Sequence, residues 1–161
     1  MVVGVGEDPV IRIVARGVIV RDATILVIEV DDGSGCWWIL PGGRQEYGET
    51  AAEAVARECR EELRCEVAVG RCVMMREFIG PRHSAIVGNV GDLHALELIF
   101  VCDLLTEPDL RPQEKLHRTI RWVAISELPE LEFFPRILAE NLPEILATEP
   151  PPIDIYVGDA G

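Results

Sequence analysis

The sequence predicts an α/β fold of the α+β kind, in which a mixed β-sheet carries helices packed on its faces. Segments rich in β-branched residues occur on both sides of one strongly helical segment, and a second helical segment follows them. The 161 residues suit one hydrophobic core, and no internal repeat or linker divides them. We therefore expect a single domain over 1–161 with a core from about 10 to 146.

Six predicted strands are short segments in which apolar residues predominate: 11–20, 24–30, 36–40, 65–79, 93–105 and 118–125. The first two flank the polar break at residues 21–23, which is typical of a hairpin. The third ends at Pro41-Gly42-Gly43, where the chain must turn sharply. Gly70 marks a bulge in the fourth.

Two helices are predicted. Thr50 and Glu53 have the spacing of a capping box, and neither Gly nor Pro occurs from Thr50 to Leu63, so a helix of about 14 residues is expected there. The second helix, 133–146, has Pro135 in its first turn and a break or kink near Pro143.

Two further segments carry turn and tail signals. Residues 80–92 contain three glycines and a proline, which predicts either a mobile loop or a plain surface connector. The tail, 148–161, is expected to be extended and without core contacts. Its segment 153–157 is a candidate to add a strand to the sheet edge of a partner.

The net charge of −13 limits the partners. Such a field repels a phosphate polymer, so we expect no binding to nucleic acid, and a small phosphorylated ligand would need a local cation. The N-terminus lacks a basic region, and no apolar run approaches the ~18 residues of a membrane span, so neither a secretory signal nor a membrane segment is predicted.

Cysteine and histidine show no metal-ligand spacing. The five cysteines are odd in number, contain no CxxC pair and lie mostly in apolar runs, so we expect reduced core thiols and a cytoplasmic location. His83, His94 and His117 lie far apart in the sequence, and we expect them to be exposed or internally satisfied.

Glu58, Glu61 and Glu62 share one face of the first predicted helix. At about 100° per residue, Glu62 falls roughly 40° to one side of Glu58 and Glu61 roughly 60° to the other. Ala51 and Ala54 leave open volume beside them. Like charges at i and i+4 repel, and Mg²⁺ would relieve this because it prefers carboxylate oxygens. The alternative is a solvated glutamate face stabilised by neighbouring arginines.

The loop before this helix completes a recognisable pattern. Residues 40–43, Leu-Pro-Gly-Gly, allow backbone groups to approach an ion or a phosphate. Gly43, Glu49 and the run Arg57–Glu62 have the spacing of the Nudix box, GX5EX7REUXEEXGU, with six fixed identities. The chain resembles this family most closely over 38–65 and more loosely over about 10–146.

Two positions depart from the pattern. Arg64 stands where the family has glycine, and Cys65 where it has a larger aliphatic residue. Glycine after a helix usually serves as a left-handed cap, so Arg64 predicts a local cost of roughly 1 kcal/mol without touching the carboxylates.

The resemblance implies a Nudix-type α/β/α sandwich and an enzyme. Members hydrolyse a nucleoside diphosphate linked to another moiety, such as ADP-ribose, a nucleotide sugar or a (d)NTP, with Mg²⁺ or Mn²⁺. By position, Gly43, Glu58, Glu61 and Glu62 would hold the metal, and Arg57 would orient Glu49 and the loop. The implied catalytic set is therefore Glu49, Arg57, Glu58, Glu61 and Glu62.

The general base stays open. Glu58 is one candidate, and an acid outside the box, Glu97 or Asp92, is another. For Glu97 the alternative is a charged residue on the solvent face of a strand.

Candidate substrate contacts lie outside the box. Arg16, Arg76 and Arg82 could clamp phosphates, because a guanidinium fits phosphate oxygens bidentately, and Glu97 is grouped with them. Pro81 falls 16 residues beyond Cys65, a spacing associated in the family with ADP-ribose substrates. Trp38 is either a stacking partner for a base or a core residue.

Two other functions occur on this kind of fold. A non-catalytic sensor could bind a nucleotide with the same fold, but it would tolerate a damaged box, whereas this one keeps its three glutamates. A prenyl diphosphate isomerase would need a reactive cysteine and a second metal cluster, which no histidine grouping supports. Dimers are common in the family, so a homodimer is among the expected assemblies.

Overall fold

A computed structural model describes residues 9–83, 91–147 and 155–159. Predictions that concern residues 1–8, the middle of the 80–92 loop and the first half of the tail lie outside this part of the chain.

The elements follow one another as β1 (Arg12–Arg21), β2 (Thr24–Asp31), β3 (Cys36–Ile39), β4 (Gly42–Arg44), α1 (Ala51–Leu63), β5 (Val67–Ile79), α2 (Gly80–His83), β6 (His94–Leu104), β7 (His117–Ala124), the 3-10 helix η1 (Ile125–Glu130), α3 (Arg136–Ala147) and β8 (Tyr156–Asp159). All six predicted strands and both predicted helices are confirmed. The short elements β4, α2, η1 and β8 were not predicted.

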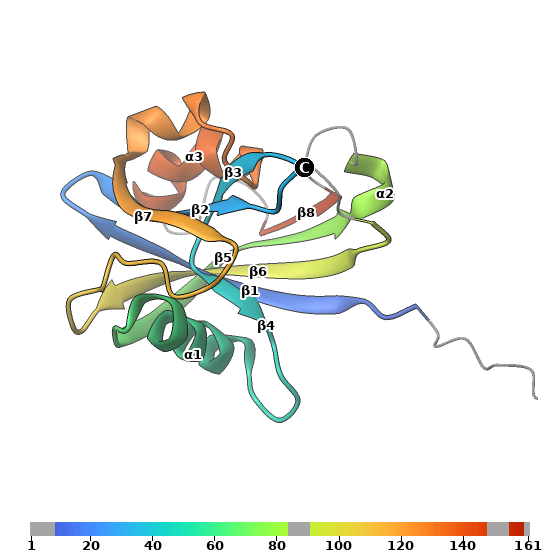
Figure 1. The fold of residues 1–161 in the computed structure, drawn as a ribbon, viewed down its shortest axis with the longest axis horizontal. Helices are drawn as coiled ribbons and strands as arrows, with labels where there is room; N and C mark the ends of the chain where they lie inside the picture. The colour runs from blue at the N-terminus through green and yellow to red at the C-terminus, as the bar shows by residue number, and fades with distance from the viewer. Residues whose placement is uncertain (1–8, 84–90, 148–154, 160–161) are drawn as a thin grey trace, which may run out of the picture.

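The sheet is mixed, as predicted. Its order is β3-β2-β1-β6-β5-β8, with β4 added to β1 and β7 added to β2. The pairs β1–β6 and β5–β8 are parallel, and the others are antiparallel. Figure 1 shows α1 on one side of the strands and α3 on the other, which is the expected α/β/α arrangement.

The predicted hairpin is confirmed at its turn. Asp22 and Ala23 both have positive φ, 48° and 59°, as a two-residue hairpin turn with the twist of the strands requires. Only Val20–Ile25 and Arg21–Thr24 then pair, because β2 leaves β1 and continues between β3 and β7. This divergence leaves the first part of β1 free to pair with β4, while β6 pairs with β1 on its other side from Arg12 to Ile19.

Two apolar clusters hold the helices against the sheet. On the α1 side, the buried residues include Ala54, Val55, Cys59 and Leu63 of the helix and Ile19 of β1. Val55, Cys59 and Leu63 recur at four-residue intervals with Ala54 beside them, so a single stripe of α1 packs and the opposite stripe is left for polar groups.

Helix α3 differs from the prediction because it is continuous through Pro143. Leu138, Leu142 and Ile145 are fully buried there against strand residues. The helix begins only after Pro135, and it continues through Pro143 to Ala147, so the predicted break is absent. Burial of Leu142 and Ile145 on both sides of the proline favours the continuous helix.

The bulge predicted at Gly70 is confirmed. The register between β5 and β6 shifts between Val69 and Cys72, which brackets Gly70. A side chain at Gly70 would place its Cβ 3.0 Å from the carbonyl oxygen of Val101, so glycine permits this close approach.

The expectation that the tail lacks core contacts is wrong. Strand β8 pairs in parallel with β5, and the Met75 amide donates a 2.6 Å hydrogen bond to the Ile155 carbonyl. Val157 packs against the α3-side core. The tail thus covers the outer edge of β5 in its own sheet, where an uncovered edge would present unpaired backbone groups.

Arg64 ends α1 in the left-handed conformation, with φ 53° and ψ 30°. Its guanidinium contacts the Gln113 side chain at 3.1 and 3.2 Å. Because a left-handed conformation costs a non-glycine residue roughly 1 kcal/mol, we expect Arg64→Gly to raise the free energy of unfolding by about that amount. Arg64→Ala, which loses the Gln113 contact but keeps the strain, is the control. Urea titrations in which both variants have equal stability would contradict this account.

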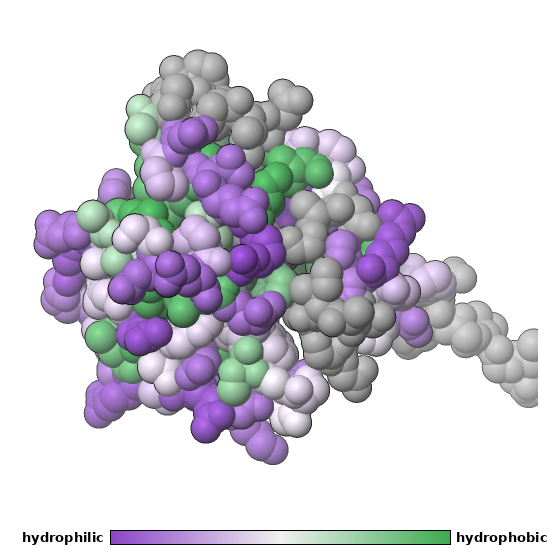
Figure 2. Space-filling view, turned by 90° about the horizontal axis from the view of Figure 1, so that it is seen from above, coloured by the Kyte–Doolittle hydropathy of each residue, from purple (hydrophilic) through white to green (hydrophobic). Residues whose placement is uncertain are grey.

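The surface agrees with the composition. Figure 2 shows a face that is mostly hydrophilic, with smaller hydrophobic areas between the polar groups. Among the described residues, no helix is both long and apolar enough to cross a membrane. All five cysteines are free thiols, as expected, although Cys36 is exposed.

Candidate active site

The capping box fixes the start of α1. The Glu53 amide donates to Thr50 Oγ1 at 3.2 Å, and the Thr50 amide donates to Glu53 Oε2 at 2.7 Å. The helix therefore begins at Ala51, and its phase turns Glu58 and Glu62 toward β4.

Gly43 lies directly against the Glu58 carboxylate. A Cβ at this position would overlap Glu58 Oε1, so only glycine allows the carboxylate to rest on the backbone of β4. Glu58 itself is only 9% exposed. The structure thus brings together two of the four predicted metal ligands.

Glu62 is tied to the same loop. It is 3% exposed, and its Oε2 accepts a 2.9 Å hydrogen bond from the Gly42 amide. Glu61, one turn from Arg57, lies at the rim with a side chain that is 55% exposed. The three predicted carboxylate ligands therefore differ in exposure: Glu58 and Glu62 are buried, and Glu61 is open to solvent.

Arg57 connects these carboxylates to Glu49. Its Nε and Nη2 donate to the two Glu49 oxygens at 3.1 and 2.8 Å, and Nη2 also donates to the Arg44 carbonyl at 2.9 Å. The predicted pairing with Glu49 is confirmed. Arg57 also donates to Glu58 at 2.9 Å and to Glu61 at 3.3 Å, although it lies about 100° from Glu58 around the helix.

This donor set fits a hard divalent cation. Burial raises the pKa of Glu58, although the hydrogen bond from Arg57 opposes this, and it raises the pKa of Glu62 further. Two carboxylates with little exposure beside a third at the rim offer oxygen ligands of the kind that Mg²⁺ prefers. Glu58, Glu61 and Glu62, with the backbone of Gly43, are the residues that would hold it.

Glu62 gives stability a pH dependence. Burial raises its pKa to about 8, although the Gly42 amide and the charge of Arg16 act in the opposite direction. The folded metal-free protein therefore binds this proton more tightly than the unfolded chain, so the free energy of unfolding falls as the pH rises from about 4.5 to about 8.

Since a cation would take the place of this proton, we expect Mg²⁺ to raise the melting temperature more near pH 8 than near pH 5. Calorimetry of the full chain in EDTA and in Mg²⁺ measures the difference. Equal stabilisation by Mg²⁺ at both pH values would contradict the assignment of Glu62.

Sequence reasoning missed His117 and Glu114. His117 begins β7, its side chain is 5% exposed, and its Nε2 lies 3.6 Å from Glu62 Oε1 and 3.5 Å from Glu114 Oε2. Burial lowers the pKa of His117, although Glu114 acts in the opposite direction. The expectation of an exposed or satisfied histidine is wrong here, because Nδ1 is buried without a partner among the described residues. The only local signal was the three-residue spacing of Glu114 and His117 just before an apolar strand.

Glu97 forms the centre of a buried charge cluster. Arg16 Nε donates to its Oε1 at 2.5 Å, and Arg76 Nε donates to its Oε2. Glu97 is 4% exposed, so the alternative that placed it on the solvent face of a strand is wrong. Burial alone would raise the pKa of Glu97, but the two guanidinium groups outweigh it and the pKa is lowered.

Arg16 also supports the loop of the carboxylate site. Its Nη1 donates to the carbonyls of Leu40, at 2.9 Å, and Gly42, at 3.3 Å. Because the Gly42 amide in turn holds Glu62, Arg16 connects the Glu97 cluster to the carboxylate cluster.

The Glu97 cluster lines a cavity of about 180 Å³. Its apolar walls include Trp37, Phe78 and Phe134. Trp38 does not take part, because it is a core residue with the Arg121 guanidinium 4.6 Å from its ring. Of the two interpretations of Trp38, the core residue is therefore correct, and the neighbouring Trp37 is the tryptophan that lines the cavity.

A second cavity, of about 460 Å³, opens beside the carboxylates. Glu58 and Glu61 line it together with Arg44, Tyr47 and Glu114. The remaining predicted residues lie elsewhere: Arg82 is in α2, at the end of β5, and Asp92 is exposed just before β6.

Comparisons with known proteins agree with this geometry. A family model described as the NUDIX domain matches residues 11–144. The chain is 33% identical over 129 residues to "Putative 8-oxo-dGTP diphosphatase 2" of Mycobacterium tuberculosis, covering 77% of this chain and 81% of that protein. It is 34% identical over 85 residues to "CTP pyrophosphohydrolase" of Escherichia coli, covering 51% of this chain and 58% of that protein.

Solved structures share the fold. A NUDIX hydrolase from Nitrosomonas europaea superposes with a TM-score of 0.70 at 16% identity, covering 86% of this chain and 90% of that one. The MutT NUDIX hydrolase from Burkholderia pseudomallei gives a TM-score of 0.63 at 25% identity, covering 81% and 96%. With the family model spanning most of the chain and the box residues assembled around one loop, the chain belongs to the Nudix hydrolase family.

Proposed function

We propose that this chain is a Mg²⁺-dependent hydrolase that cuts within the diphosphate linkage of a nucleoside triphosphate, releasing a nucleoside monophosphate and pyrophosphate. The observation that carries the proposal is the cluster of Glu58, Glu61 and Glu62 beside the loop of Gly42 and Gly43, with Glu58 and Glu61 lining the cavity that Arg44 also lines. The relatives named for 8-oxo-dGTP, CTP and nucleoside triphosphates support the triphosphate class.

The carboxylates and the arginine have complementary tasks. When bound, Mg²⁺ supplies positive charge that offsets the charge of the phosphates and acidifies water, and Mn²⁺ can take its place. Glu58, Glu61 and Glu62 would hold the cation, and Arg44, which lines the cavity with Glu58 and Glu61, would donate hydrogen bonds to phosphate oxygens. Arg57 and Glu49 keep Glu58 oriented.

Glu58 is the best placed residue to accept the proton of the attacking water. It lies in the cavity wall, and its oxygen Oε1 is positioned by Arg57. Glu97 is less suitable, because both of its oxygens accept hydrogen bonds from arginines, which stabilise the ionised form. Arg16 and Arg76 both donate to Glu97. We therefore assign them to support of the site and not to a phosphate clamp.

We place the nucleobase of the substrate in the cavity of about 180 Å³ beside Glu97. Trp37, Phe78 and Phe134 offer flat apolar surfaces, and base–aromatic stacking is worth about 1–3 kcal/mol. We therefore expect Trp37→Ala to raise KM by roughly 5- to 160-fold with little change in kcat. Tyr47→Ala, at the exposed aromatic residue of the other cavity, is the matched comparison. A larger rise in KM for Tyr47→Ala than for Trp37→Ala would show that the nucleobase binds in the cavity beside Glu58 and Glu61 instead.

A substrate panel tests the proposal. The full chain is incubated with Mg²⁺ and with (d)NTPs including 8-oxo-dGTP and CTP, beside ADP-ribose, nucleotide sugars and dinucleoside polyphosphates. We expect the highest kcat/KM among the triphosphates and no turnover in EDTA. Preference for ADP-ribose, which the position of Pro81 would favour, would reassign the substrate. Nucleotide binding without any product would support the sensor instead. The cytoplasmic location, the homodimer and the lack of nucleic-acid binding stay predictions.

A further inference from the structure

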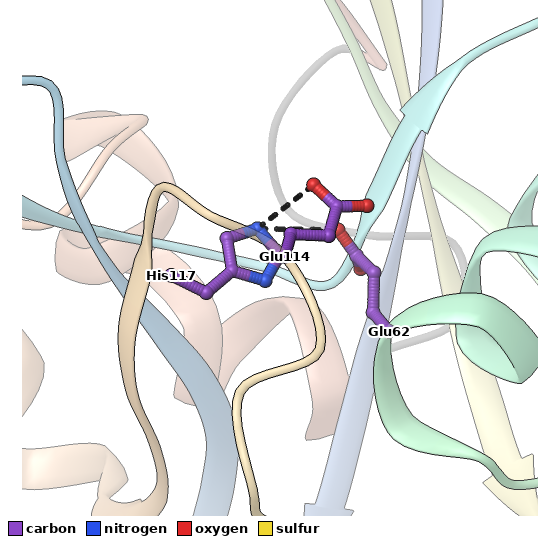
Figure 3. Close-up of side chains that lie close together, drawn as sticks. All are labelled: Glu62, Glu114 and His117. Carbon is purple, nitrogen blue, oxygen red and sulfur yellow. Dashed lines mark ion pairs between the residues drawn. The ribbon is translucent and has the colours of Figure 1, made fainter.

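Three side chains from different elements converge beside the carboxylate cluster. Glu62 comes from the end of α1, Glu114 from the segment before β7, and His117 from the first position of β7. One ligand atom from each lies within 4.8 Å of the others. Figure 3 shows the His117 ring and the two carboxylates pointing toward one another.

The distances within this group are unlike those of hydrogen bonds. His117 Nε2 lies 3.6 Å from Glu62 Oε1 and 3.5 Å from Glu114 Oε2, whereas N–H···O bonds measure about 2.7–3.2 Å. Two ligands that bind one ion at about 2.1 Å lie roughly 3.0 Å apart at an octahedral angle and roughly 3.4 Å apart at a tetrahedral angle. The two histidine–carboxylate distances are therefore nearer to the separation of two ligands of one ion than to a hydrogen bond.

The buried ring of His117 faces the two glutamates through its Nε2. Its side chain is 5% exposed, and Nε2 is the ring nitrogen that faces polar groups, since Nδ1 has no partner in the part of the chain that the structure describes. Glu62 is directed in the same way, because its Oε2 is held by the Gly42 amide and its Oε1 faces His117. Glu114 is 48% exposed, which leaves an access path from solvent.

We propose that Glu62, Glu114 and His117 form a cation position with a nitrogen ligand, which selects a first-row transition-metal ion such as Mn²⁺ or Co²⁺ over Mg²⁺. Glu62 would be shared with the Glu58 and Glu61 position, so this inference rests on the proposed function in that Glu62 must be a metal ligand. Mg²⁺ prefers oxygen, whereas affinity for mixed nitrogen and oxygen sites rises along the transition series.

The missing partner of Nδ1 sets the expected affinity. A histidine that binds a metal usually donates its other N–H to a carboxylate or carbonyl, and loss of that contact costs about 10- to 100-fold in affinity. We therefore expect an exchangeable ion at this position and not a permanently bound structural one.

Pulsed electron paramagnetic resonance of the full chain with Mn²⁺ alone tests the site. We expect modulation from a directly bound nitrogen in the wild type and its loss in His117→Asn. Competition titrations should show Mn²⁺ affinity at this position reduced about tenfold or more in Glu114→Gln, with Mg²⁺ affinity much less affected. His94→Asn is the matched control, because His94 Nε2 lies 3.4 Å from Glu77 in a histidine–glutamate pair on other strands.

The outcomes separate this inference from the proposed function. Mn²⁺ binding without nitrogen modulation, or modulation that persists in His117→Asn, would overturn the nitrogen ligand and leave the Mg²⁺ site intact. Absence of Mn²⁺ binding to the chain would overturn both. Glu114→Gln changes a half-exposed side chain, so it remains informative if His117→Asn fails to fold.

Discussion

Glu62→Gln is expected to lower kcat by roughly 10³-fold, equivalent to about 4 kcal/mol, while the protein stays folded. The glutamine keeps an oxygen that can accept from the Gly42 amide, but it removes the charge that would bind the cation. Because burial raises the pKa of Glu62 to about 8, the neutral side chain is also the better tolerated one, so the metal-free variant should be more stable than the wild type near pH 8.

Steady-state kinetics in saturating Mg²⁺ and denaturant titrations in EDTA measure the two effects. Glu66→Gln is the matched control, since Glu66 follows α1 in the sequence with a side chain that is 52% exposed and paired with Arg60. We expect nearly wild-type kinetics from it. A Glu62→Gln variant that turns over as fast as Glu66→Gln would remove Glu62 from the active site.

Glu97→Leu is expected to lower the free energy of unfolding by roughly 3–5 kcal/mol. The substitution removes the carboxylate that the guanidinium groups of Arg16 and Arg76 share, and these two side chains are only 17% and 8% exposed. Turnover should fall as well, because Arg16 holds the Leu40 and Gly42 carbonyls of the loop that precedes the carboxylate helix and also holds Glu62. In the wild type, the lowered pKa of Glu97 means that its stabilisation is present above about pH 4.5 and is lost as the pH falls through the folded pKa.

Glu107→Leu provides the comparison for this stability effect. Glu107 makes a two-point contact with Arg21, at 2.8 and 3.1 Å, but its side chain is 79% exposed. Exposed ion pairs contribute about 0–1 kcal/mol, so Glu107→Leu should have a small effect. Similar losses for the two variants in urea titrations would show that the Glu97 cluster is not a buried network.

Local signals explain what the sequence could predict. The capping box at Thr50, the helical phase of Glu58 and Glu62, and the apolar strands all depend on residues within a few positions of one another. The same holds for Gly70, whose bulge was visible as a glycine inside a strand. The Nudix box is itself such a local pattern, which is why the α1 carboxylates could be assigned.

Long-range pairing explains what the sequence could not predict. The tail became β8 because the edge of β5, some 80 residues earlier, was available to it. For Glu97 the sequence left both a functional site and the solvent face of a strand open, because no local signal showed that β1 and β5 place Arg16 and Arg76 on its two sides. His117 meets Glu62 only because β7 pairs with β2 and brings its first residue to the end of α1.

The position of cleavage tests the central claim most directly. Phosphorus NMR of the full chain with Mg²⁺ and the best triphosphate of the panel follows all products at once. We predict one nucleoside monophosphate and one pyrophosphate for each triphosphate consumed, with no reaction in EDTA. Release of inorganic phosphate and nucleoside diphosphate, or product formation that does not depend on Mg²⁺, would contradict the assignment of Glu58, Glu61 and Glu62 to a cation that directs hydrolysis within the diphosphate linkage.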